Sequence, residues 1–124
     1  MLFRSNPDPI NTISVHIYDG EGFPAGAHTF SEIVTHLVRE AEAGGKPLFI
    51  GEFGLRNRAS RDEQQPEFGR LLNALEQRRV PLAAVWVFDY PEQNQQWNIT
   101  FDNERAAFLE TIRETNRRIA LLNQ

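Results

Sequence analysis

The sequence predicts an α/β fold built on a parallel sheet. Stretches with the composition of β-strands alternate along the 124 residues with stretches that have the periodicity of amphipathic helices. Two of the strand-like stretches are continuously apolar, which is typical of strands buried on both faces of a parallel sheet. The order strand, helix, strand, helix, strand, helix favours right-handed crossovers, with any chemistry at the carboxyl ends of the strands.

The composition is that of a globular domain, because 40% of the residues are hydrophobic and 24% are charged. We expect residues 1–124 to form one domain. The net charge of -4 argues against a nucleic-acid partner, which would need clustered Lys and Arg. No apolar stretch is long enough to span a membrane, and the first residues do not resemble a signal peptide. Cysteine is absent, which excludes thiolate chemistry but leaves the compartment open.

The first predicted strand, Thr12–Tyr18, is rich in β-branched and aromatic residues and is followed by an Asp-Gly turn and a glycine-rich loop. Thr29 and Glu32 form a capping-box pattern that predicts the start of a helix. The pair Gly44–Gly45 predicts its end. Between these signals, apolar residues recur at helical spacing, at Phe30, Ile33, Val34, Leu37, Val38 and Ala41.

The second predicted strand is the apolar run Pro47–Phe53. A polar loop from Leu55 to Gln65 follows it, and Pro66 suits the first position of the next helix. The apolar stripe of that helix consists of Phe68, Leu71, Leu72 and Leu75.

The third predicted strand is Pro81–Phe88, and the loop that follows it carries Tyr90 and Trp97. Asp102 has the position and residue type of an N-cap for a last helix. The predicted buried face of this helix consists of Phe108, Ile112, Thr115, Ile119 and Leu122.

Four side chains of the types found in catalytic and binding sites lie at the carboxyl ends of these strands. His16 and Tyr18 share one face of the first strand, because side chains alternate along a strand. Glu52 ends the second apolar run, where a partly buried carboxylate needs donors nearby, and His16 and Tyr18 on the adjacent strand are the expected donors. Trp86 lies at the same height on the third strand. Taken alone, each residue is explained as a solvated or packed side chain without a function. Their position at the same level on consecutive strands favours a functional site.

These segments together resemble the sixth to eighth βα units of retaining (β/α)8-barrel glycoside hydrolases, in the clan that includes family 5 cellulases and mannanases. His16-Ile17-Tyr18 is similar to the His-x-Tyr of the sixth strand, and residues 46–54 are similar to the strand that carries the nucleophile. Residues 85–88 resemble the eighth strand, whose Trp lies beneath the sugar. Trp97 and residues 101–105 resemble the closing loop and final helix. The resemblance implies a partial TIM (β/α)8 barrel with three consecutive βα units and a parallel sheet, the C-terminal portion of a hydrolase domain.

The resemblance also implies a function, which is retaining hydrolysis of a β-linked oligo- or polysaccharide. Glu52 would be the catalytic nucleophile, and His16, Tyr18 and Trp86 would contact the substrate. We expect no cofactor and no metal. Dinucleotide and P-loop patterns are absent from the sequence, and its three His residues are scattered.

One departure from the family is large, because the acid/base Glu that follows an Asn on the fourth strand has no counterpart here. The only Asn-Glu pair, Asn103–Glu104, lies at a predicted helix start. A full barrel takes about 250 residues. We therefore expect a fragment with little activity alone, whose unpaired edge strands self-associate or pair with a missing N-terminal barrel half. The alternative interpretation is a non-catalytic carbohydrate-binding or structural α/β fragment.

Overall fold

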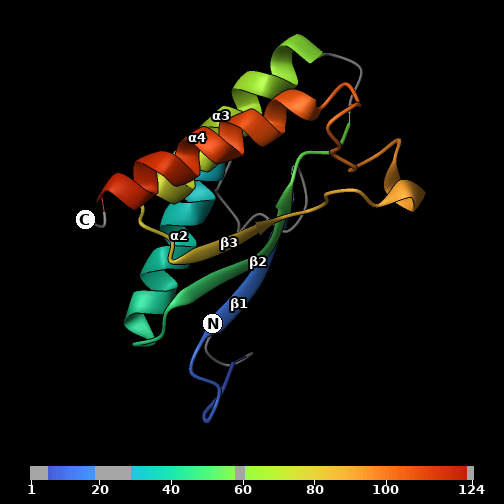
Figure 1. The fold of residues 1–124 in the computed structure, drawn as a ribbon. Helices are drawn as coiled ribbons and strands as arrows, with labels where there is room; N and C mark the ends of the chain where they lie inside the picture. The colour runs from blue at the N-terminus through green and yellow to red at the C-terminus, as the bar shows by residue number, and fades with distance from the viewer. Residues whose placement is uncertain (1–5, 19–28, 58–60, 123–124) are drawn as a thin grey trace.

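In a computed structural model, the chain forms a three-stranded parallel sheet with its helices on one side (Figure 1). The structure describes residues 6–18, 29–57 and 61–122, so the predicted glycine-rich loop lies outside the described residues. The strands run in the order β1-β2-β3. Their bounds are β1 Ile13–Tyr18, β2 Leu48–Gly54 and β3 Leu82–Val85, and the helices are α2 Phe30–Ala43, α3 Arg61–Gln77, the short 3-10 helix η1 Pro91–Gln93, and α4 Ala106–Leu122. The predicted α/β class and the parallel βα order are confirmed.

Local signals start and end α2 where the sequence predicts. The Thr29 side chain accepts a hydrogen bond from the Glu32 amide at 3.2 Å, and the Glu32 carboxylate accepts one from the Thr29 amide at 3.0 Å. This reciprocal pair satisfies two amides that a helix N-terminus leaves without partners. Gly45 follows the helix with a φ of 64° and donates to the Glu42 carbonyl at 3.0 Å. Glycine adopts that φ without steric cost, so the predicted stop is confirmed.

The hydrophobic core lies between the sheet and the helices. Because side chains alternate along a strand, Ile13 and Ile17 of β1 share the face that points into it, and Ile50 and Phe53 of β2 are buried there as well. Phe68 of α3 is fully buried. Its ring stacks on Phe108 with 4.2 Å between the ring centroids, and it lies 6.2 Å from the ring of Phe53. The helices also contribute Ile33, Val34, Leu37, Leu71, Leu72 and Leu75.

Helix α3 begins at Arg61, so the prediction that Pro66 occupies its first position is wrong. Asp62 and Glu63 occupy the first turn, where negative side chains interact favourably with the helix dipole. Pro66 is exposed inside the helix. The helix therefore tolerates it at the loss of one backbone hydrogen bond, the one that proline has no N–H to donate.

Strand β3 ends at Val85 rather than at Phe88, which corrects the predicted strand end. The Trp86 amide still donates to the Phe53 carbonyl of β2 at 2.8 Å. Beyond it the backbone pairs with its own loop, because the Ile99 amide donates to the Val87 carbonyl at 2.8 Å. The following loop thus takes the hydrogen bonds that a longer strand would have given to the sheet.

The predicted cap of α4 is also corrected, because Asp102 does not cap the helix. Its carboxylate accepts a hydrogen bond from the Thr100 hydroxyl at 2.6 Å. The Asn103 side chain accepts one from the Arg105 amide at 2.9 Å, just before α4 begins at Ala106. An Asn side chain satisfies a free helix-start amide as well as an Asp does, so the sequence pattern did not separate the two neighbours.

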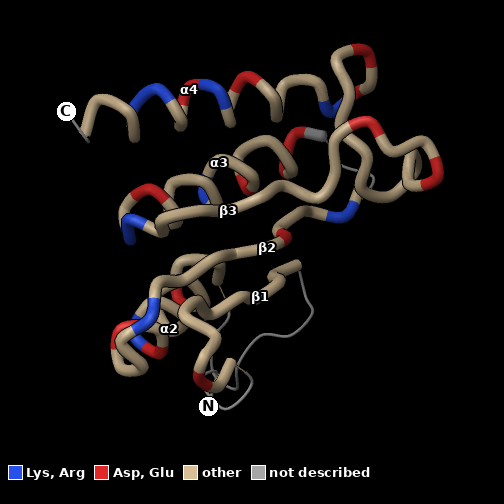
Figure 2. The backbone as a smooth tube through the Cα atoms, turned by 60° about the horizontal axis from the view of Figure 1, so that its bottom comes forward, with Lys and Arg blue, Asp and Glu red and all other residues tan. Residues whose placement is uncertain are grey.

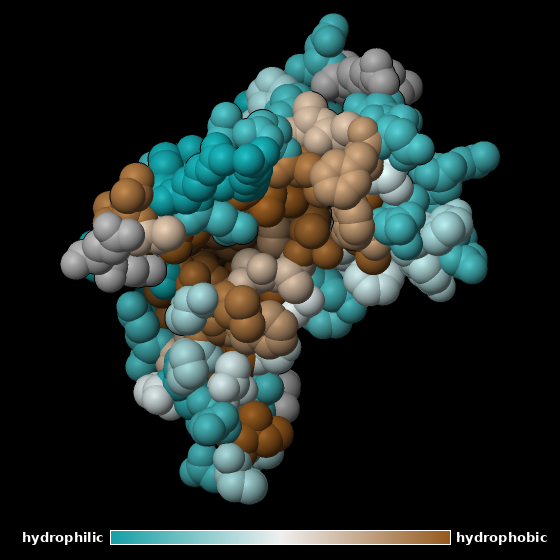
Figure 3. All heavy atoms as spheres, viewed as in Figure 1, coloured by the Kyte–Doolittle hydropathy of each residue, from teal (hydrophilic) through white to brown (hydrophobic). Residues whose placement is uncertain are grey.

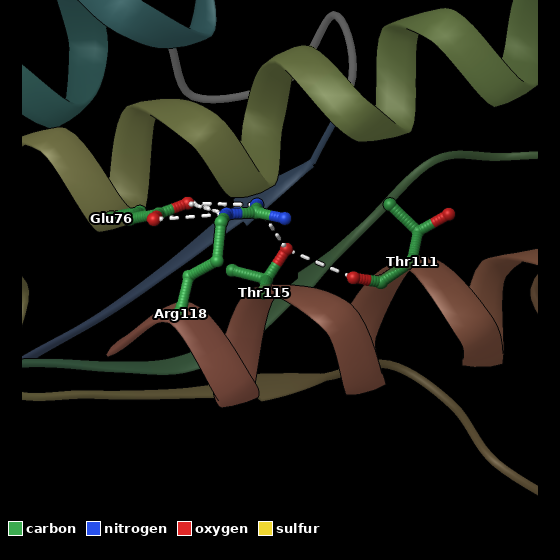
Figure 4. Close-up of polar contacts among 4 residues, drawn as sticks. All are labelled: Glu76, Thr111, Thr115 and Arg118. Atoms are coloured by element: carbon green, nitrogen blue, oxygen red, sulfur yellow. Dashed lines mark hydrogen bonds and ion pairs between the residues drawn. The ribbon is translucent and has the colours of Figure 1, made fainter. Parts of the chain in front are cut away.

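Helix α4 packs along α3 through a polar network (Figure 4). The Arg118 guanidinium donates three hydrogen bonds to the Glu76 carboxylate, the shortest at 2.8 Å, and another to the Thr115 hydroxyl at 3.1 Å. The Thr115 hydroxyl donates to the Thr111 carbonyl at 2.9 Å. The hydrogen bond to Glu76 raises the pKa of Arg118, because it favours the charged guanidinium. The predicted apolar face is only partly buried: Phe108 and Thr115 are buried, Ile112 and Ile119 are half-buried, and Leu122 is exposed.

Beside β3 the core opens into an apolar groove. A hollow of about 270 Å³ lies between β3 and α4, and its lining includes Val80, Val85, Ile112 and Ile119. Figure 3 shows it as a hydrophobic strip that is open to solvent. β3 is an edge strand of the described sheet and Leu82 at its start is 60% exposed, so the prediction that the third strand is buried on both faces is wrong. None of the described helices is long and apolar enough to cross a membrane. Apolar surface beside an unpaired strand edge is typical of an interaction site.

We expect the isolated chain to associate through this edge and groove, because association removes apolar surface from water. The apparent mass in light scattering should rise with protein concentration. Leu82→Lys should reduce that rise, because charged residues on an edge strand oppose strand pairing. Leu121→Lys is the matched control, since Leu121 is 69% exposed on α4 and does not line the groove. A monodisperse monomer at every concentration would contradict this expectation.

Candidate active site

An irregularity in strand β2 turns Glu52 away from the core. Val15 of β1 pairs with Ile50, but the next residue, His16, pairs with Glu52, so Gly51 is an extra residue in β2. The bulge lets Ile50 and Phe53 both stay buried in the core while Glu52 projects from the opposite face. A β-carbon at Gly51 would lie 3.1 Å from His16 Nε2, so glycine also gives the imidazole room to lie over β2.

Glu52 is the one Asp, Glu, Lys or Arg within the three described strands (Figure 2). The Tyr18 hydroxyl donates a hydrogen bond to Glu52 Oε2. His16 Nδ1 lies 3.3 Å from the same oxygen. The Glu52 side chain is 28% exposed, and that of His16 is 52% exposed. Among the described residues, both contacts given for Glu52 fall on Oε2.

Trp86 follows β3 and joins the group through its backbone. Its indole N–H donates to Gln93 Oε1 at 2.8 Å, and its ring stands edge-on to that of Tyr90 with 6.3 Å between centroids. Trp86 as a whole is partly exposed. An indole whose N–H is held in place can stack on an apolar face of a ligand.

Trp97 and Gly54 complete the surroundings of Tyr18. The rings of Tyr18 and Trp97 meet edge to face, with 4.9 Å between centroids. Gly54 is the register partner of Tyr18 on β2. A β-carbon at Gly54 would lie 2.6 Å from the Trp86 carbonyl oxygen and 3.4 Å from the Trp97 ring. The absence of a side chain at Gly54 therefore allows both tryptophans to approach β2.

Of the four predicted site residues, the structure places Glu52, His16 and Tyr18 in direct contact. Trp86 adjoins them through the hydrogen bond of its amide to the Phe53 carbonyl. His36 is exposed on helix α2, whereas the candidate site lies on and next to the strands. His28 lies outside the described residues.

Gln93, the partner of the Trp86 indole, was not predicted from the sequence. It lies in a polar loop without periodicity, where no sequence signal distinguishes it from its neighbours. The role of Gly54 was not predicted either, although a glycine next to the Glu-Phe pair is a signal for close backbone approach. Within residues 6–18, 29–57 and 61–122, no group of three or more His, Asp or Glu residues is arranged to hold a metal ion.

Comparisons with known proteins address the fold. No family model and no curated protein sequence matches the chain. Among solved structures, an endo-β-1,4-mannanase from Thermotoga petrophila superposes on 89% of this chain with a TM-score of 0.62 at 15% identity. A glycoside hydrolase family 5 mannosidase from Rhizomucor miehei superposes on 90% of it with a TM-score of 0.64 at 12% identity, and an endo-1,4-β-mannanase from the same organism on 90% with a TM-score of 0.60 at 19% identity.

The chain has the fold of part of a (β/α)8 barrel. It covers 26% of the length of the first of these proteins, 39% of the second and 30% of the third. In a barrel of this kind the active site lies at the carboxyl ends of the strands. Glu52, Tyr18 and Trp86 all lie at or just beyond that end of their strands in this barrel portion. At such low identity the likeness concerns the fold, and function has to be argued from the site.

Proposed function

We propose that this chain carries the nucleophile of a retaining glycoside hydrolase that acts on a β-linked glycan. The observation that carries the proposal is the contact of Glu52 with both Tyr18 and His16 at the carboxyl end of a barrel-type sheet. A carboxylate held by donors on one oxygen can attack an anomeric carbon with the other. The solved structures with a similar fold include a mannosidase and two mannanases, and this similarity supports a carbohydrate substrate.

In the proposed reaction, Glu52 Oε1 attacks the anomeric carbon and forms an ester with the sugar, while the glycosidic oxygen leaves with a proton from an acid. Water then attacks the same carbon and gives a proton to the conjugate base of that acid, while Glu52 leaves as the free carboxylate. Tyr18 and His16 hold Oε2 during both steps. Trp86 presents its indole face to the sugar ring, because the apolar faces of pyranoses stack on aromatic rings.

Retaining hydrolysis also needs an acid/base carboxyl group roughly 5–5.5 Å from the nucleophile. We assign that group to another strand of the barrel, because Glu52 is the one Asp or Glu within the three described strands. General acid help contributes roughly 10²–10⁴-fold, so the isolated chain should turn over natural glycans very slowly. Formation of the ester on Glu52 needs no acid when the substrate carries a good leaving group. This first step is therefore the one to test.

Trapping with a 2-deoxy-2-fluoro glycoside tests the proposal. The 2,4-dinitrophenyl leaving group departs without a proton, and the fluorine slows hydrolysis of the ester, so a fluoroglycosyl adduct should accumulate. Gluco and manno forms should be compared, because the sugar is not specified by the fold. We expect intact mass spectrometry to show one added fluoroglycosyl group and peptide mapping to place it on Glu52. Binding of oligosaccharides without an adduct would instead support the carbohydrate-binding alternative.

A further inference from the structure

The loop that follows β3 touches the candidate site twice. Trp97 stands edge-on to the ring of Tyr18, and Gln93 accepts the indole N–H of Trp86. We propose that Trp97 is a positioning residue, which holds the Tyr18 ring where its hydroxyl meets Glu52. This inference rests on the proposed function of Glu52 as the nucleophile, and it adds a residue that acts through Tyr18 rather than on the sugar.

The backbone around Trp97 is tied to two strands. The Trp97 amide donates to the Gln93 carbonyl at 3.0 Å, and the Val87 amide beyond β3 donates to the Trp97 carbonyl at 3.5 Å. The neighbouring Gln96 carbonyl accepts a hydrogen bond of 2.6 Å from the Asn57 amide beyond β2. The Trp97 ring is therefore presented to β1 by a segment anchored at the ends of both other strands.

Gly54 makes this approach sterically possible. It pairs in register with Tyr18 and lies two residues after Glu52 on β2. A β-carbon there would overlap the Trp86 carbonyl oxygen at 2.6 Å and press on Trp97 Cε3 at 3.4 Å. A side chain at Gly54 would therefore require the backbone at Trp86 to shift, and Trp86 precedes the loop that carries Trp97.

The contact matters because a tyrosine side chain turns about two torsions. With the ring fixed by Trp97, the hydroxyl meets Glu52 Oε2 and orients the carboxylate. Without that support Tyr18 and Glu52 sample other rotamers, and the attacking oxygen is correctly placed for less of the time. A misplacement of about 1 Å in a reacting group can reduce the rate by about 10²-fold. We therefore expect a loss in the chemical step and little change in sugar binding.

Trapping kinetics with the 2,4-dinitrophenyl 2-deoxy-2-fluoro glycoside separate these two quantities. For Trp97→Leu we expect the limiting inactivation rate constant to fall about tenfold, while the inhibitor concentration for half-maximal rate stays within about twofold. Trp97→Phe should restore most of the rate, because it keeps an aromatic edge. Phe101→Leu is the matched control: Phe101 is 82% exposed and makes an edge-on contact with Phe88, not with Tyr18. Its rate constant should equal that of the wild type.

A second readout does not depend on activity. The chain has two tyrosines, so carbon-13 labelling of tyrosine rings gives a spectrum in which the Tyr18 signals are easily assigned. Trp97→Leu should move the Tyr18 ring-proton shifts, because the indole ring current is lost, and Phe101→Leu should not. If Trp97→Leu fails to fold, Gly54→Ala tests the same contact and should move the Tyr18 shifts in the same direction.

The outcomes separate the two proposals. Trapping of the wild type with an unchanged rate constant in Trp97→Leu would overturn the role of Trp97 and leave Glu52 as the nucleophile. No trapping of the wild type would overturn the proposed function. In that case, unmoved Tyr18 shifts in Trp97→Leu would overturn the positioning contact too.

Discussion

Glu52→Gln should abolish trapping by the fluoroglycoside. An amide oxygen is a poor nucleophile toward an anomeric carbon, so no ester forms, while the side chain keeps its size and still accepts a hydrogen bond from Tyr18. Glu52→Asp should lower the inactivation rate constant about 10²-fold, because it withdraws the attacking oxygen by about one bond length. Intact mass spectrometry over a time course measures both effects.

Glu104→Gln is the matched control for this carboxylate. Glu104 is exposed and accepts a hydrogen bond of 2.9 Å from the Asn57 side chain, and it belongs to the only Asn-Glu pair of the sequence. We expect trapping at the wild-type rate in Glu104→Gln, because a residue that precedes a helix on the surface takes no part in attack. An adduct that persists in Glu52→Gln would show that another residue is the nucleophile.

Phe68→Ala should remove a large part of the folding stability. Phe68 has no exposed surface and stacks on Phe108 at 4.2 Å, next to Phe53 at 6.2 Å, so its ring joins α3 to both β2 and α4. Truncation of a buried phenylalanine costs about 3–5 kcal/mol, as lost burial and a cavity that closes only partly. The melting temperature should fall by roughly 10–20 °C, or the chain should not fold at room temperature. Thermal unfolding followed by circular dichroism measures the change.

An exposed phenylalanine provides the comparison for Phe68. Phe101 is 82% exposed, so Phe101→Ala should change the free energy of unfolding by less than about 0.5 kcal/mol. Equal losses in the two variants would mean that the ring stack of Phe68 is not the centre of the core.

Sequence patterns predicted the fold where the signal is local. The capping box of Thr29 and the stop at Gly45 depend on contacts within a few residues, and both are present. The element bounds that went wrong depend on competition between distant segments. β3 stops at Val85 because the loop near Ile99 takes the next backbone hydrogen bonds, and nothing within residues 81–88 signals that competitor.

The candidate site was predicted as a set of residue types at strand ends. The alternation of side chains placed His16 and Tyr18 on one face, and the end of an apolar run singled out Glu52. The contact among the three depends on the bulge at Gly51, which shifts the register between β1 and β2 by one residue. A register shift is set by which side chains can be buried together, so it was not predictable from the separate strands.

Other features depend on atoms brought together from across the chain. Arg105 is buried, donates to the Leu55 carbonyl and lies 4.7 Å over the Phe108 ring, although a charged residue before a helix normally suggests exposure. Gln93 accepts the indole N–H of Trp86, and the Trp97 ring contacts Tyr18. Both residues lie in a loop whose sequence has no periodicity.

The sequence by itself determined the alternation of strands and helices, the buried stripes of α2 and α3, and a carboxylate near the end of the second strand. Hydrophobic periodicity and capping act over one or two turns of chain, so these properties survive in a single sequence. Only the tertiary structure decided that both contacts fall on the same oxygen of Glu52, and which tryptophan ring contacts Tyr18. Such contacts depend on register and on the space left at Gly51 and Gly54, which exist only after the strands have packed side by side.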